Sequence, residues 1–129
     1  MLLPQLTADA QDYYAEMAAR GRLLTIQQEG FLWGLCTYYL VDEVDEASRY
    51  LSRDMYSTPA DSPHGIWAYI DQLGGLQWSR ETLRQVRAVL LETHPQLVGA
   101  IWHRQTRGGG WRRYTLGREG GFYGTSVSG

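Results

Sequence analysis

This chain contains no lysine and no asparagine, and it has one cysteine and four prolines among its 129 residues. All 12 basic residues are therefore arginine, and with 14 acidic residues the formal net charge is −2. This balance creates no overall field that would attract nucleic acid or an anionic membrane surface. We attribute the missing lysine and asparagine to biased codon usage in a GC-rich bacterium or its phage, which indicates a source and no function.

The single cysteine and the hydrophobic segments limit where the protein works. Cys36 lies in the apolar segment 31–41 and cannot form an internal disulfide, so we expect it in the core. No hydrophobic stretch approaches the roughly 20 residues needed to span a bilayer. Residues 1–4 also lack the basic segment and continuous apolar run of a signal peptide. The sequence therefore predicts a protein of the cytoplasm, or of the virion if a phage encodes it, without a membrane partner.

Hydrophobic periodicity and turn residues predict an alternation of helices and strands. The predicted helices cover 7–20, 42–52 and 79–93. The predicted strands cover 22–28, 31–41, 65–72, 98–103, 111–116 and 122–125. This order predicts a single α/β domain over residues 1–129, with a mixed sheet flanked by helices and a flexible glycine- and serine-rich tail from about residue 117. The same architecture is found in the GNAT acyltransferase superfamily.

The segment Gly65–Trp78 is predicted to be a buried strand ending near Asp71, followed by a glycine turn and a helix capped by Ser79. Ligands of α/β sheets bind at such strand-to-helix junctions. By alternation Asp71 shares a face with Trp67 and Tyr69. A carboxylate beside aromatic surface is suited to acid–base catalysis, which makes Asp71 a candidate catalytic residue. The alternative is that Asp71 caps the turn, as aspartate often does.

Several segments, in chain order, resemble the RTX toxin-activating lysine acyltransferases of the GNAT superfamily. They are Leu23-Leu24-Thr25, Gly30 with the apolar strand that follows it, Glu43 with Ser48-Arg49-Tyr50-Leu51, Trp67–Leu73, His94-Pro95 and Val98–Trp102. The resemblance covers roughly residues 22–105. It implies a GNAT-like fold, transfer of a fatty acyl group from acyl carrier protein to a lysine, and Asp71 as the active-site aspartate. The family also carries an essential histidine before the sheet, whereas residues 1–22 of this chain contain none.

The three histidines differ in how they relate to Asp71. His64 precedes Asp71 by seven residues of predicted strand, roughly 20 Å when extended, so we do not expect the two to pair. His103 ends the strand that we expect beside the Asp71 strand, and the two residues share an edge if the strands are parallel. We therefore predict His103 as the general base, oriented by Asp71; the alternative is a surface histidine at a strand end. His94, before Pro95, suits the C-terminal end of a helix.

Four residues after the Asp71 strand are candidate cofactor contacts. GNAT enzymes hold the pyrophosphate of acyl-CoA with a Gln/Arg-x-x-Gly-x-Gly/Ala loop at a helix N-terminus. The candidates here are Gln72, Gly74, Gly75 and Gln77. Gln72 and Gly75 match that pattern, whereas Gln77 occupies its final small position. Glycines are also expected at any strand–turn–helix junction. If the chain is an active enzyme, the resemblance implies an acyl group carried by acyl carrier protein or by coenzyme A as the donor, and we predict no metal site.

An arginine-rich hairpin leaves other functions open. Four arginines flank two tryptophans around a triple glycine: Arg104, Arg107, Arg112 and Arg113 with Trp102 and Trp111. Such a set can bind phosphate or single-stranded nucleic acid, or contact an acidic acyl carrier protein. It can also be a solvated hairpin whose arginines cover the exposed tryptophan rings. The sequence thus leaves three functions: a GNAT-like acyltransferase acting on a lysine or another amine, a catalytically inactive GNAT-fold protein with a virion or host-protein partner, and a nucleic-acid accessory protein. The near-neutral charge disfavours the last.

Overall fold

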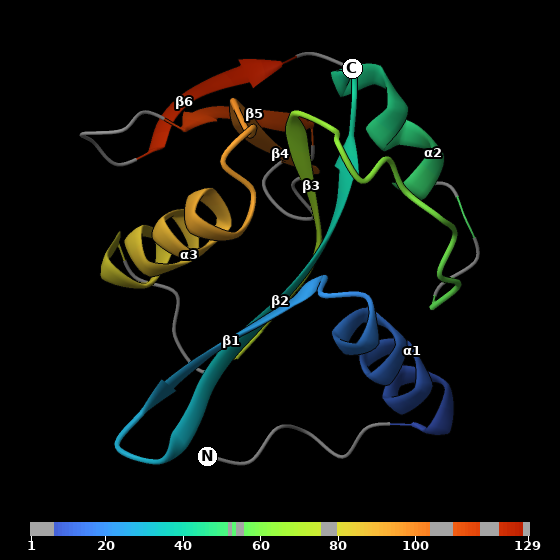
Figure 1. The fold of residues 1–129 in the computed structure, drawn as a ribbon, viewed down its shortest axis with the longest axis vertical. Coiled ribbons are helices and arrows are strands. Elements are labelled where there is room, and N and C mark those ends of the chain that lie inside the picture. Colours follow the sequence, from blue (N-terminus) through green and yellow to red (C-terminus); the bar gives the residue numbers. More distant parts are fainter. Residues whose placement is uncertain are drawn as a thin grey trace.

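The computed structural model describes residues 7–51, 53, 56–75, 80–103, 110–116 and 122–127 (Figure 1). Within these ranges six strands form one sheet in chain order: β1 (Leu23–Gln28), β2 (Phe31–Val41), β3 (Trp67–Gly75), β4 (Gly99–His103), β5 (Trp111–Leu116) and β6 (Phe122–Val127). The helices are α1 (Ala8–Ala19), the 3₁₀ turn η1 (Val44–Glu46), α2 (Ala47–Leu51) and α3 (Arg80–Thr93).

The sheet is mixed because one of its five strand pairs is parallel. β3 and β4 run parallel, and the other neighbours run antiparallel. Parallel strands need a crossover connection, which α3 supplies. α1 and α2 lie on one face of the sheet and α3 on the other (Figure 1). The predicted α/β fold with a mixed sheet flanked by helices is confirmed.

The N-terminal helix begins and ends where the sequence predicts. The Thr7 side chain caps α1 by accepting a hydrogen bond from the Ala10 backbone N–H at 3.2 Å. Gly21 follows the helix with φ +72°, a conformation that glycine adopts without steric cost. Tyr13 and Met17 face the sheet and are buried. α1 therefore fixes Tyr13 against the face of the sheet that also carries Asp71.

The central strand β2 separates two hydrophobic cores. Tyr38 and Leu40 point toward α3, whereas Tyr39 and Val41 point toward α1 and α2. All four are buried, which confirms that this strand is covered on both faces. Among the described residues, no helix has the length and apolar character needed to cross a membrane.

Two strands extend beyond their predicted C-terminal ends. β3 extends to Gly75, so Asp71 lies within the strand and not at its end. β6 occupies Phe122–Val127 inside the predicted tail and pairs with β5, while residues 117–121 and 128–129 lie outside the described part of the chain. Both strands extend because a neighbouring strand offers free backbone hydrogen-bonding groups, which local composition does not reveal.

Candidate functional site

Asp71 lies at a β-bulge. Where β2 pairs with β3, Thr37 lies opposite Gln72 but Tyr38 lies opposite Ile70. Asp71 is therefore the extra residue of β3 and has no partner in the ladder. Bulges bend a strand, increase its twist and redirect a side chain. Here the bulge leaves the Asp71 side chain on the face covered by α1 and α2.

The Asp71 carboxylate is held by a cation and by a phenol. Arg53 Nη1 donates to Oδ1 at 3.0 Å and Nη2 to Oδ2 at 2.6 Å, and the two side chains are only 12% and 4% exposed. The Tyr13 hydroxyl donates to Oδ2 and itself accepts from Thr37 Oγ1, 2.6 Å away. Tyr69 belongs to the same core, and the charge of Asp71 acts on its phenol. Arg53 and Tyr13 account for three of the roughly four acceptor positions that a carboxylate offers.

The phenols beside Asp71 remain protonated. Burial raises the pKa of Tyr13 far above its ordinary value of 10, and the negative charge of Asp71 raises it further. Burial and the same charge also raise the pKa of Tyr69. Both phenols are therefore hydrogen-bond donors and not bases at neutral pH. Asp71 acts in this structure as an acceptor that joins β3 to α1 and to Arg53.

β3 and β4 pair over three residues and then part. Residues 67–69 lie opposite residues 99–101. Beyond this point β3 continues along β2 to Gly75, whereas β4 continues along β5 to His103. The bulge at Asp71 coincides with the place where the two strands separate. The separation makes room between the strands beneath α3.

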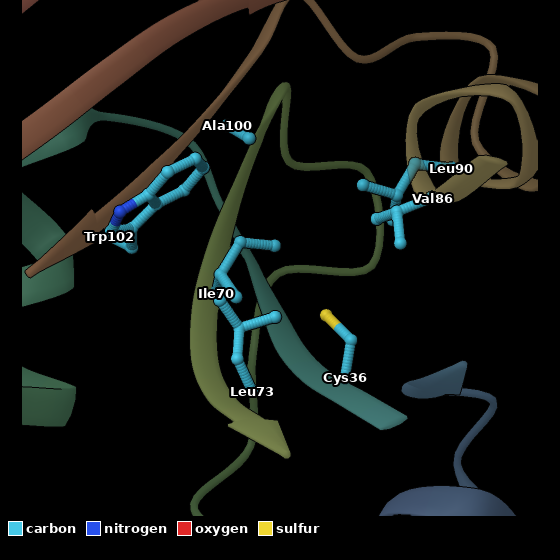
Figure 2. A pocket seen from close by; sticks show the side chains of 7 residues that line it. All are labelled: Cys36, Ile70, Leu73, Val86, Leu90, Ala100 and Trp102. Carbon is cyan, nitrogen blue, oxygen red and sulfur yellow. The ribbon is translucent and has the colours of Figure 1, made fainter. Parts of the chain in front are cut away.

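An apolar pocket lies on the α3 face of the sheet, between the separating strands and α3 (Figure 2). Four elements line it with seven side chains: Cys36 from β2, Ile70 and Leu73 from β3, Val86 and Leu90 from α3, and Ala100 and Trp102 from β4. Leu73 is 43% exposed and Trp102 is partly buried, while the other five are buried, so the opening lies beside these two. The cavity is about 10 Å³, the space of roughly one water molecule. Its lining suits hydrocarbon.

Cys36 lies in the core, as the sequence predicts, and it also lines this pocket. Its side chain is fully buried, and its sulfur lies on the pocket side of β2 (Figure 2). Burial raises the pKa of the thiol to about 12, with a further contribution from the charge of Asp71. The thiol is thus uncharged at neutral pH and acts as an apolar wall.

His103 lies on the opposite face of the sheet from the pocket, the face that also carries Asp71, and it does not bond to Asp71. Its ring meets the Trp111 ring edge-on at 5.2 Å between centroids, and Trp111 contacts Tyr69 at 5.9 Å. Nδ1 of His103 is buried and has no hydrogen-bond partner among the residues that the structure describes. The two strands are parallel, which was the condition for His103 and Asp71 to share an edge. If the three-pair register continued, it would bring His103 level with Asp71. Because the strands part first, Asp71 binds Arg53 and Tyr13 and does not orient His103.

The four predicted cofactor residues do not form one described loop. Gln72, Gly74 and Gly75 lie in β3, opposite residues 34–37 of β2. The predicted glycine turn at Gly74 and Gly75 is therefore wrong. β2 spans 11 residues, so its first half offers partners that keep β3 extended. Gln77 lies outside the described residues, as does the helix cap predicted at residue 79.

His94 is a buried structural residue at the end of α3. Its backbone N–H donates to the Leu90 carbonyl at 2.8 Å. Nε2 lies 2.8 Å from the Tyr38 hydroxyl, which donates to the Gly21 carbonyl at 3.0 Å. Burial lowers the pKa of His94, and the charge of Arg22 lowers it further. The helix-end position is confirmed, but burial favours the neutral imidazole over the cation.

Stability should therefore fall as the pH drops below about 6.5, the ordinary pKa of an unfolded histidine. Below that value the unfolded chain takes up a proton that native His94 resists, so unfolding becomes more favourable until the pH reaches the lowered native pKa. Urea unfolding between pH 7 and pH 5 measures the effect. His94→Gln should reduce the change of the unfolding free energy with pH, whereas His64→Gln, at an exposed position, should leave it unchanged. An equal pH dependence in the natural chain and both variants would contradict this assignment.

Sequence reasoning missed Tyr13 and Arg53 as site residues. Tyr13 lies in the predicted helix 7–20, and Arg53 lies between the predicted helix 42–52 and the predicted strand 65–72. Besides binding Asp71, Arg53 donates to the carbonyls of Tyr50 at 2.5 Å and Ser57 at 3.0 Å. The one signal in the sequence was Asp71 itself, because a carboxylate buried in an apolar strand needs a cationic partner. Nothing in the sequence indicated which arginine.

Comparisons with known proteins do not identify a family for this chain. No family model matches the chain, and no curated protein or solved structure is significantly similar to it. The functional interpretation therefore depends on the site's own geometry.

Proposed function

We propose that this chain is a GNAT-like acyltransferase that moves an acyl group from a thioester donor, acyl-CoA or acyl carrier protein, to a lysine or another amine. The observation that carries the proposal is the parting of β3 from β4 beside Asp71. The apolar pocket lies on the α3 face, and the opposite face carries Asp71 and His103. We place the meeting of donor and amine where the strands separate, between these two sets of residues.

Arg87 supports an anionic donor. It lies on α3, next in sequence to the pocket residue Val86, and its Nε and Nη2 atoms are buried with no hydrogen-bond partner in the described part of the chain. Unpaired donors of a charged group cost folding free energy. The phosphates of coenzyme A or of phosphopantetheine would supply acceptors for them.

The chemistry requires one group that accepts a proton. The amine nitrogen attacks the thioester carbonyl carbon, the C–N bond forms, and the C–S bond breaks. The proton released by the amine passes through His103 to the departing thiolate, which leaves as a thiol. We assign this role to His103 because the Asp71 carboxylate is already occupied by Arg53 and Tyr13. Asp71 is then a positioning residue, which holds the bulge where the strands part.

A catalytically inactive GNAT-like protein that binds a virion or host protein is the second candidate. The same occupancy of Asp71 favours it, together with the unpaired Nδ1 of His103. A histidine base is usually oriented by an acceptor at its second nitrogen, and neither Asp71 nor another described group supplies one. The two candidates differ in whether a bound donor is consumed.

Donor binding and turnover test the proposal on the purified chain. Acetyl-CoA, longer acyl-CoAs and acyl carrier protein are added, and melting temperature and the mass of an amine acceptor are recorded. A donor at 100 times its Kd should stabilise the protein by about 2.7 kcal/mol. In Arg87→Met the donor should no longer raise the melting temperature, whereas in Arg49→Met, at an exposed position on α2, it should raise it as in the natural chain. His103→Gln should still be stabilised by the donor but should form no acylated amine.

Two results would decide against the acyltransferase. Stabilisation by none of the donors, with no acylated amine, rules it out. Donor binding without transfer, unchanged in His103→Gln, supports the inactive protein instead.

A further inference from the structure

We infer that Trp102 sets the length of the acyl chain that the pocket accepts. This inference builds on the proposed function, since it identifies the residue that selects the substrate at the same site. Trp102 follows Ala100 on the α3 face of β4, and Figure 2 shows its indole beside Ile70 and Ala100.

Most of the pocket wall cannot adapt to a longer chain. Cys36, Leu90 and Ala100 are fully buried, and Val86 is 3% exposed. These residues belong to the hydrophobic core between α3 and the sheet. Interiors of this kind are close-packed, so making room there costs stability. Additional length must therefore be accommodated at the opening.

Trp102 is the larger of the two residues at that opening. It lies just beyond Ile101, the last residue of β4 that pairs with β3. Its backbone pairs with β5 at Arg112, so a change of its side chain leaves the β3–β4 ladder intact. A cavity of about 10 Å³ has room for roughly one water molecule. With the indole in place, only a very short acyl group fits.

The lining also defines what the occupant is. All seven side chains are apolar or, in Cys36, an uncharged thiol. A hydrogen-bonding group placed there would lose its partners in water and gain none. The occupant is therefore the hydrocarbon part of a donor. Enlarged apolar cavities in proteins stay dry and take up small hydrocarbons.

Trp102→Ala tests the inference against Trp67→Ala, a matched change on the opposite face of the sheet. Acetyl-, butanoyl-, hexanoyl- and octanoyl-CoA are titrated, and methyl NMR signals are followed for Ala100 in the pocket and for Ala47 in the other core. The natural chain and Trp67→Ala should prefer acetyl-CoA. Trp102→Ala should prefer the longer thioesters, with binding about fourfold tighter for each methylene it newly buries. The Ala100 signal should move and the Ala47 signal should not.

Straight-chain alcohols from ethanol to octanol separate this inference from the proposed function. If no thioester binds but Trp102→Ala takes longer alcohols than the natural chain does, the acyltransferase is wrong and the role of Trp102 stands. If Trp102→Ala leaves the length preference unchanged, or Trp67→Ala alters it equally, the role of Trp102 is wrong. Should Trp102→Ala not fold, Trp102→Leu is measured in the same way and decides by the same outcomes.

Discussion

Replacing Asp71 with alanine should destabilise the protein by about 3–5 kcal/mol, because it leaves the Arg53 guanidinium buried without its counter-charge. The two side chains are 12% and 4% exposed, so water does not replace the lost partner. Tyr13 would also lose the carboxylate to which its hydroxyl donates. The midpoint and slope of urea unfolding measure the loss.

Matched variants separate the ion pair from the phenol. Tyr13→Phe removes one hydrogen bond to a charged group and should cost about 1.5–3 kcal/mol, less than Asp71→Ala. The double change Asp71→Leu with Arg53→Met removes both charges and should recover a large part of the loss. If Asp71→Ala instead unfolds like the natural chain but abolishes acyl transfer, Asp71 is a free catalytic carboxylate and its assignment as a positioning residue is wrong.

Replacing Gly65 with alanine should cost about 3 kcal/mol, at the upper end of typical overpacking effects. A Cβ atom on Gly65 would lie 2.7 Å from the Val41 backbone nitrogen and oxygen. These atoms end β2 and cannot rotate away as a side chain would. The Gly65 N–H also donates to the Ser62 carbonyl at 2.8 Å, which fixes the approach of the chain to β3.

Gly30→Ala is the control for this prediction. Gly30 lies in the β1–β2 turn with φ +81° and has open space where a Cβ would be added. Its replacement should cost about 1–2 kcal/mol from backbone strain alone. Thermal unfolding of both variants gives the comparison. If Gly30→Ala lowers the stability more than Gly65→Ala does, the close contact of Gly65 with Val41 is not maintained in solution.

Much of the fold was predictable because its signals are local. Thr7 and Gly21 mark the ends of α1, Glu29 and Gly30 form the hairpin turn with positive φ, and apolar residues on both faces of β2 indicate that both are buried. Alternation along β3 placed Asp71 and Tyr69 on one face, and both lie on the side of the sheet that Tyr13 covers. The end of β3 was wrong, because the extension of a strand depends on the partner beside it.

The candidate site was predictable only in part. Asp71 and His103 were identified, and their strands are neighbours as expected. The interaction predicted between them is absent, because β3 and β4 part at the bulge and Asp71 binds Arg53 and Tyr13. A bulge adds one residue to one strand of a pair, so it exists only relative to the partner strand and leaves no periodic trace in its own sequence.

By itself, the sequence determined the α/β class, the order of the elements, the burial of Cys36 and the face that carries Asp71. Each follows from periodicity, turn residues or composition within a short stretch of chain. Only the tertiary structure decided which groups bind Asp71 and where β3 and β4 part. Tyr13 and Arg53 are 58 and 18 residues from Asp71 along the chain. Their meeting depends on how α1, α2 and the sheet pack together, which no local pattern encodes.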